Sequence, residues 1–225
     1  MKKTLLLFGF VLLVISCSKN SIRDRIKNDS TVNKVFNTNE IYSLIKIVEF
    51  VDSIVISETP DLSIDSSFHY FLDSIKTKAL TLGFITEAID QDYKYEFIFS
   101  LEPSLRRNIW RTDSIAYHIK YKDTILENLN DFPRLELKNK SKFMEYIKLL
   151  GENDKGFKEL YEDVNHCGCL SQSLKAGYVI NHHKLDFNKI DNHIWISVFI
   201  LTLEEHIDKK VERYLKKKGS VHNIS

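Results

Sequence analysis

The sequence has few of the residues on which recognisable active-site motifs depend. Among its 225 residues there are seven glycines, three prolines and three cysteines. It contains no Gly-x-Ser-x-Gly, no His-Glu-x-x-His and no glycine-rich phosphate loop, and no unit of about twenty to fifty residues repeats. The sequence therefore carries no familiar catalytic motif, and we favour a function that is not enzymatic.

Neither sign of charge is in excess. Lysine and arginine together number 32 and aspartate and glutamate 31, which gives a formal net charge of +1. Proteins that bind nucleic acid need clustered positive charge to meet the phosphates. The composition therefore predicts that nucleic acid is not a partner.

Apolar runs long enough to cross a membrane are also missing. The run from Leu5 to Ile15 has eleven residues, which as a helix measures about 16 Å against about 30 Å of hydrocarbon. The run from Ile194 to Leu201 is shorter still. Neither segment predicts a membrane-spanning helix.

The N-terminal run has the three parts of an export signal. Lys2 and Lys3 precede the apolar run, and Ser16 precedes Cys17. The residues Val14-Ile15-Ser16-Cys17 resemble the lipobox of bacterial lipoproteins. That resemblance implies cleavage of a signal peptide over residues 1–16, diacylglyceryl transfer to the Cys17 thiol, and acylation of the new amino terminus, for example by palmitate. The alternative is an ordinary cleaved signal followed by a chance cysteine.

The residue after the lipidated cysteine bears on its destination. In the sorting pattern of Gram-negative lipoproteins an aspartate there favours inner-membrane retention, whereas this chain has Ser18. We therefore expect a cell-envelope protein anchored in the outer membrane and facing the periplasm. The lipid on Cys17 is the only attached group that we expect, and the membrane is the partner that it implies.

Two regions are predicted after the signal. Residues 17–37 are polar and mixed in charge, which predicts a lipidated cysteine followed by a flexible tether. With 43% hydrophobic residues overall, the remainder, residues 38–225, predicts a single globular domain.

Apolar periodicity predicts an α+β fold that is mainly helical, with a small antiparallel sheet in the middle of the chain. Three- and four-residue spacing of apolar residues predicts helices over residues 40–55 and 63–78. The same spacing returns after Ser141, where it predicts two helices with a break between them at Gly151. One long helix is predicted from about residue 188, with residues 194–201 as a buried centre. Alternation predicts strands over 93–101 and 115–121, and a third near Leu135 and Leu137.

A Cys-Gly-Cys motif carries the sharpest local chemistry. In an oxidising periplasm Cys167 and Cys169 would pair across Gly168 in a very small, strained and therefore easily reduced ring. A protonated His166 would favour a thiolate. The motif predicts a labile redox pair, with a structural bridge or two reduced cysteines at a helix end as alternatives.

The same motif supplies candidate metal ligands. Thiolate and imidazole together suit zinc or copper, and the candidate set is His166, Cys167, Cys169, His182 and His183. The spacing does not match a zinc finger, and chance placement among eight histidines is the alternative.

The segment between the first two predicted strands is rich in arginine. It carries Arg106, Arg107, Trp110 and Arg111, a group that would grip a carboxylate, a glycan or a peptide if it formed an exposed loop. The segment can also hold a short helix, and its tryptophan can cover a sheet edge.

These features favour an anchored binding or interaction module. Its partner would be an envelope protein or a glycan. The alternative is a thiol-redox or metal-binding factor built on the region of Cys167 and Cys169.

Overall fold

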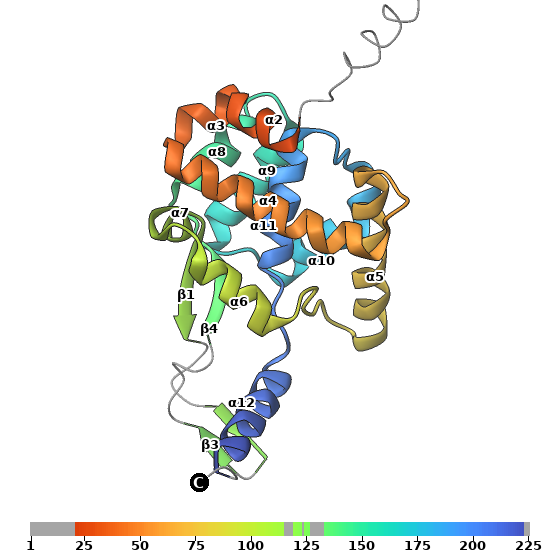
Figure 1. Ribbon diagram of the computed structural model, residues 1–225, viewed down its shortest axis with the longest axis vertical. Helices are drawn as coiled ribbons and strands as arrows, with labels where there is room; N and C mark the ends of the chain where they lie inside the picture. Colours follow the sequence, from red (N-terminus) through yellow and green to blue (C-terminus); the bar gives the residue numbers. More distant parts are fainter. Residues whose placement is uncertain (1–20, 115–118, 123, 127–132, 223–225) are drawn as a thin grey trace, which may run out of the picture.

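The computed structural model describes residues 21–114, 119–122, 124–126 and 133–222 (Figure 1). Helices dominate, and two small antiparallel sheets accompany them. This confirms the predicted α+β class with mainly helical content. The predicted signal peptide and Cys17 lie outside the described residues.

The first two helices correct the predicted tether. From residue 21 on, the chain is not extended but forms α2 (Ile22–Asn28) and α3 (Ser30–Val35), capped by Ser21 and Asp29. Of the few apolar side chains, Ile26, Val32 and Phe36 are buried in the main core, and Ile22 and Val35 pack against it partly buried. Apolar residues too sparse to order a segment alone are sufficient when neighbouring helices supply the other side of the contact.

Two longer helices follow as predicted. They are α4 (Thr38–Glu58) and α5 (Ile64–Leu82). A capping box starts α4, in which the Asn37 side chain accepts from the Glu40 N–H and the Glu40 carboxylate accepts from the Asn37 N–H. Gly83, with φ of 78°, ends α5 in the left-handed conformation.

The predicted strand over residues 93–101 is wrong. Residues 91–100 form α6 (Gln91–Ser100), which Asp90 caps through the Tyr93 N–H. Tyr95 and Ile98, three residues apart, are buried, whereas Phe99 is exposed. The alternating aromatic residues therefore do not sort onto two faces of a strand.

The arginine-rich segment is a short helix and a strand. It forms α7 (Pro103–Ile109) and β1 (Trp110–Ser114). β1 pairs antiparallel with β4 (Pro133–Leu137), with Trp110 opposite Leu137, which confirms the predicted third strand. β2 (Ile119–Tyr121) pairs with β3 (Thr124–Leu126) in a separate sheet. Of the strand predicted over 115–121, residues 115–118 lie outside the described residues.

The C-terminal half is helical again. Its elements are α8 (Lys142–Leu150), α9 (Lys155–Cys167), α10 (Gln172–Asn181), the 3₁₀ helix η2 (His182–Lys184), α11 (Ile190–Leu201) and α12 (Ile207–His222). The break at Gly151 is as predicted. The long helix predicted from residue 188 is instead two helices, separated by residues 202–206.

The core has one large and one small part. α11 runs through the middle of the helical body (Figure 1), and its residues from His193 to Leu201 are all buried, as predicted for the apolar centre. The small part forms around Val211 of α12, against Tyr121 and Leu126 of the β2–β3 sheet. Within the described ranges, no helix is both long and apolar enough to cross a membrane.

Candidate functional site

A groove of about 780 Å³ opens between the end of α5, α10 and residues 203–207. Three apolar side chains in its lining are largely exposed: Leu80 at 74%, Ile180 at 47% and Phe84 at 40%. Val179 and Leu203, which also line the groove, are buried. The groove therefore combines a buried apolar wall with an apolar rim in contact with water.

Charged groups line the same groove. The cations are Lys76, Arg134, Lys175 and Lys210, and the carboxylates are Glu204 and Glu205. Arg134 is paired with Glu136 and Lys210 with Glu204. The two lining carboxylates therefore do not neutralise every lining cation.

Lys175 is the buried cation of the groove. Lys175 is 7% exposed, and its Nζ donates to the Thr202 carbonyl oxygen at 3.2 Å. Among the described residues no carboxylate forms an ion pair with it. Burial lowers the pKa of Lys175 and the positive charge of Arg134 lowers it further, whereas Glu204 raises it.

The N-terminus of α10 lies beside this lysine. Ser171 caps the helix through the Leu174 N–H, and the Lys175 N–H donates to the Ser171 carbonyl. Gln172 and Ser173, the first two residues of the helix, line the groove, and their N–H groups have no acceptor among the described residues. A helix N-terminus carries partial positive charge and adds to the field of the lysine.

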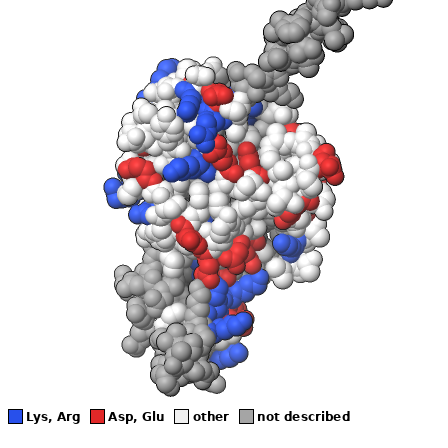
Figure 2. Space-filling view, viewed as in Figure 1, with Lys and Arg blue, Asp and Glu red and all other residues white. Residues whose placement is uncertain are grey.

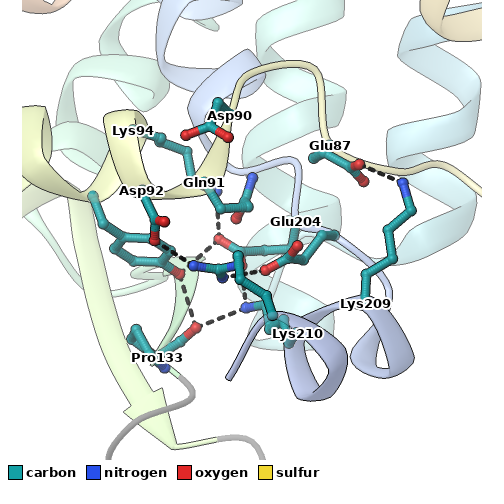
Figure 3. Close-up of polar contacts among 12 residues, drawn as sticks. Glu87, Asp90, Gln91, Asp92, Lys94, Pro133, Glu204, Lys209 and Lys210 are labelled. Atoms are coloured by element: carbon teal, nitrogen blue, oxygen red, sulfur yellow. Dashed lines mark hydrogen bonds and ion pairs between the residues drawn. The ribbon is translucent and has the colours of Figure 1, made fainter. Parts of the chain in front are cut away.

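Glu204, in the lining of the groove, is held by three side-chain donors and by the Leu135 backbone N–H (Figure 3). The Lys94 Nζ lies 2.7 Å from its Oε1, the Tyr95 hydroxyl donates to the same oxygen at 2.9 Å, and Lys210 pairs with Oε2. Burial alone would raise the pKa of Glu204, but Lys94 and Lys210 together lower it. The carboxylate is therefore ionised and its acceptor capacity is largely used.

Lys94 is completely buried. Burial lowers its pKa to about 8, although the Glu204 carboxylate opposes this shift. With Lys175 and Lys210, it brings three buried lysines close to one carboxylate. The network therefore has more positive than negative charge.

α12 is attached to the helical body chiefly by ion pairs. Figure 2 shows basic side chains gathered over α12 directly below a group of acidic ones. Lys209 pairs with Glu87 at 2.7 Å, and Arg213 pairs with Asp92 and Glu205. Lys210 also donates to the Pro133 carbonyl oxygen at 2.7 Å (Figure 3). These contacts fix Lys210 in the wall of the groove.

The cysteine motif lies at the end of a helix. Cys167 is the last residue of α9, and Gly168 ends the helix with φ of 74°. Both cysteines are free thiols in this structure, Cys167 exposed and Cys169 partly buried. The last turn of a helix carries partial negative charge, the opposite of the surroundings in which reactive cysteines occur.

The candidate metal ligands are not brought together. Within the described ranges, no group of three or more His, Cys, Asp or Glu side chains is placed to hold a metal ion. His166 and His183 are exposed, whereas His182 is buried and hydrogen-bonded to His69 and Asp73. The two adjacent histidines are separated in this way because the His182 side chain is buried and the His183 side chain is exposed, and chance placement, the alternative to a metal site, agrees with this arrangement.

The arginine-rich group does not form a shared loop. Trp110 is 2% exposed and packs in the main core. Arg111 pairs with Glu136, and the Arg106 guanidinium lies over the Phe99 ring, 4.9 Å from its centroid. Arg107 is exposed. The segment is therefore a helix and a strand in which the tryptophan is inside and the arginines are outside.

Sequence reasoning missed the groove, although one signal for it exists. Lys175 and Val179 are four residues apart and share the buried face of α10. A lysine at a core position of an amphipathic helix is unusual and marks a charge that needs a partner.

The chain matches no protein-family model, no curated protein and no solved structure.

Proposed function

We propose that this protein is a lipid-anchored binding module of the cell envelope, with the groove as its ligand site. The observation that carries the proposal is the groove itself, which places exposed Leu80, Phe84 and Ile180 beside buried Lys175. Its volume falls in the range of about 300–1,000 Å³ typical of small-molecule sites. Such sites are mainly apolar with a small number of polar groups that fix orientation. This lining has the apolar side chains of such a site, together with a larger share of charged groups.

The anchor is the second part of the proposal. The lipobox-like sequence ending at Cys17 supports attachment to the outer membrane with the domain facing the periplasm. Two or three acyl chains on one residue give essentially permanent attachment, since each buried methylene contributes about 0.8 kcal/mol. Labelled palmitate should enter the wild-type protein in cells and should not enter the Cys17→Ser variant.

Binding in the groove is tested with a neutral amphiphile. The full-length chain is reconstituted in phosphatidylcholine nanodiscs and titrated calorimetrically with decanol, with empty nanodiscs as the blank. Leu80→Ser combined with Ile180→Ser should weaken binding at least tenfold, because these side chains supply apolar contact.

The matched control changes two other exposed apolar residues. Ile56 and Leu62 are 40% and 47% exposed and do not line the groove. Ile56→Ser combined with Leu62→Ser should bind decanol as the wild type does. Equal affinity in all three proteins, or no binding to the wild type, would overturn the groove as the ligand site.

A further inference from the structure

Lys175 is a buried cation that has no ion-pair partner among the residues that the structure describes. Burying an ammonium group costs free energy unless an anion accompanies it. Its only hydrogen bond within the described residues goes to a backbone carbonyl, a partner without net charge. The side chain nevertheless lines a groove open to solvent, where an outside anion has access.

The carboxylates that line the groove or act electrostatically on Lys175 already have partners. Glu204 is shared by Lys94 and Lys210, and Glu205 pairs with Arg213. Glu136, on β4, pairs with Arg111 and Arg134. Because these ion pairs satisfy the acidic groups, the positive charge of Lys175 is left for a ligand.

Two further features favour an anion at this place. Gln172 and Ser173, in the first turn of α10, line the same groove as Lys175, and the N-terminus of a helix carries partial positive charge. Leu80, Phe84 and Ile180 add exposed apolar surface to the lining of the same groove. A ligand that satisfies both parts has a negatively charged head and a hydrocarbon tail.

We infer that the groove binds an amphiphile with a single anionic head, with the head on Lys175 and the alkyl chain along Leu80, Phe84 and Ile180. This inference rests on the proposed function and specifies its ligand class. A free fatty acid and a lysophosphatidic acid offer the same chemistry, through a carboxylate and a phosphate monoester respectively. The experiment separates these two sources.

The test compares head groups on one chain length. The full-length chain in phosphatidylcholine nanodiscs is titrated with decanoate, decyl phosphate, decanol and decyltrimethylammonium. Decanoate or decyl phosphate should bind about tenfold or more tightly than decanol, since a hydrogen bond to a charged group is the stronger kind. The tighter of the two anions identifies the source. The cationic amphiphile should bind most weakly of all.

Variants then assign the selectivity to one side chain. In Lys175→Met the anions should lose their advantage over decanol, while decanol affinity stays within about twofold. Lys78→Met removes the same charge from exposed α5 surface outside the groove and should keep the wild-type preference. Thermal unfolding checks that both variants fold, and Lys175→Gln serves as a second variant should the methionine variant fail.

The outcomes separate the inference from the proposed function. Decanol binding that depends on Leu80 and Ile180, without any preference for the anions, would leave the binding groove standing and overturn the anionic ligand. If both Lys175 variants still bind the anions more tightly than decanol, the inference that Lys175 binds an anionic head is also overturned. Failure of every amphiphile to bind would overturn both proposals.

Discussion

The Nδ1 of His69 lies 2.9 Å from the Nδ1 of His182, although 113 residues separate the two histidines. His69 is on α5 and His182 begins η2. The Nε2 of His182 lies 3.1 Å from Asp73, and that of His69 lies 3.7 Å from Asp65. Two ring nitrogens at this distance share one proton, because two imidazolium ions would place like charges in contact.

This arrangement predicts that the protein loses stability in mild acid. Burial lowers the pKa of His182, and His69 and Lys76 lower it further, although Asp73 opposes them. The unfolded chain, with a histidine pKa near 6.5, therefore binds more protons than the folded one below that pH. The free energy of unfolding should fall as pH drops through about 6.5, by at most about 1.4 kcal/mol per pH unit for this group.

Urea unfolding between pH 8 and 5 measures that slope. His182→Gln should show a smaller loss of stability over this range than the wild type. His166→Gln, which changes an exposed histidine on α9, should keep the wild-type slope. Identical slopes in all three proteins would rule out His182 as the source.

The Glu204 network predicts that replacing its carboxylate lowers the free energy of unfolding more than replacing one of its lysines. Glu204→Gln leaves the buried Lys94 and Lys210 without their carboxylate and should lower the free energy of unfolding by about 3–5 kcal/mol. Lys94→Met removes one of several cations and leaves Glu204 paired with Lys210, so its cost should be clearly smaller. Urea unfolding at pH 7 compares the two variants. A Lys94→Met cost equal to or above that of Glu204→Gln would contradict the excess of positive charge.

We expect Glu40 to stabilise the fold by an amount that depends on its ionisation. It is 1% exposed and accepts hydrogen bonds from the Asn37 N–H, Lys142, Ser104 and Asn108. Burial raises its pKa, but the hydrogen bonds from Asn37 and Lys142 outweigh burial and lower the pKa overall. The stabilisation is therefore complete above about pH 4.5 and is lost as pH falls through the lower folded pKa.

Replacing Glu40 with glutamine should cost about 2 kcal/mol at pH 7, because hydrogen bonds to a charged group become bonds to a neutral one. Chemical unfolding at pH 7 and pH 4 tests this, and the difference between wild type and Glu40→Gln should shrink at the lower pH. Glu58→Gln, at the other end of α4 and exposed, is the control and should have little effect at either pH. A constant difference across pH would show that ionisation of Glu40 is not responsible.

The cysteine motif predicts an order of alkylation. Cys167 is exposed and Cys169 is partly buried, so iodoacetamide should modify Cys167 first and Cys169 more slowly. Intact mass followed by peptide mapping of the untreated protein measures both rates. A starting mass lighter by two hydrogens, restored by mild reductant, would show instead the labile bridge that the sequence alone suggests.

Helices with regular apolar spacing could be predicted from the sequence, and those that depend on context could not. In α4, α5, α8 and α9 the buried residues recur every three or four positions, and the apolar residues 194–201 are the buried centre. In α6 the aromatic residues alternate with other side chains as they would in a strand, yet the segment is a helix that Asp90 caps. α2 and α3 carry too few apolar residues to show a period.

The groove could not be predicted because it exists only in three dimensions. Its lining comes from three separated parts of the chain, around residues 76–85, 172–180 and 203–210, together with Arg134. No motif spans such separations. Lys175 on the buried face of α10 is the single local sign of it.

The position of α11 in the chain determines when the core can form during synthesis. The helix that fills the centre of the body begins at Ile190, so the ribosome makes most of the polypeptide before the other helices gain their shared packing partner. Until then the apolar faces of α4 and α8 have no complete core to join. The apolar faces of these helices therefore remain exposed until late in synthesis, and the nascent chain needs protection from aggregation and proteolysis during that time.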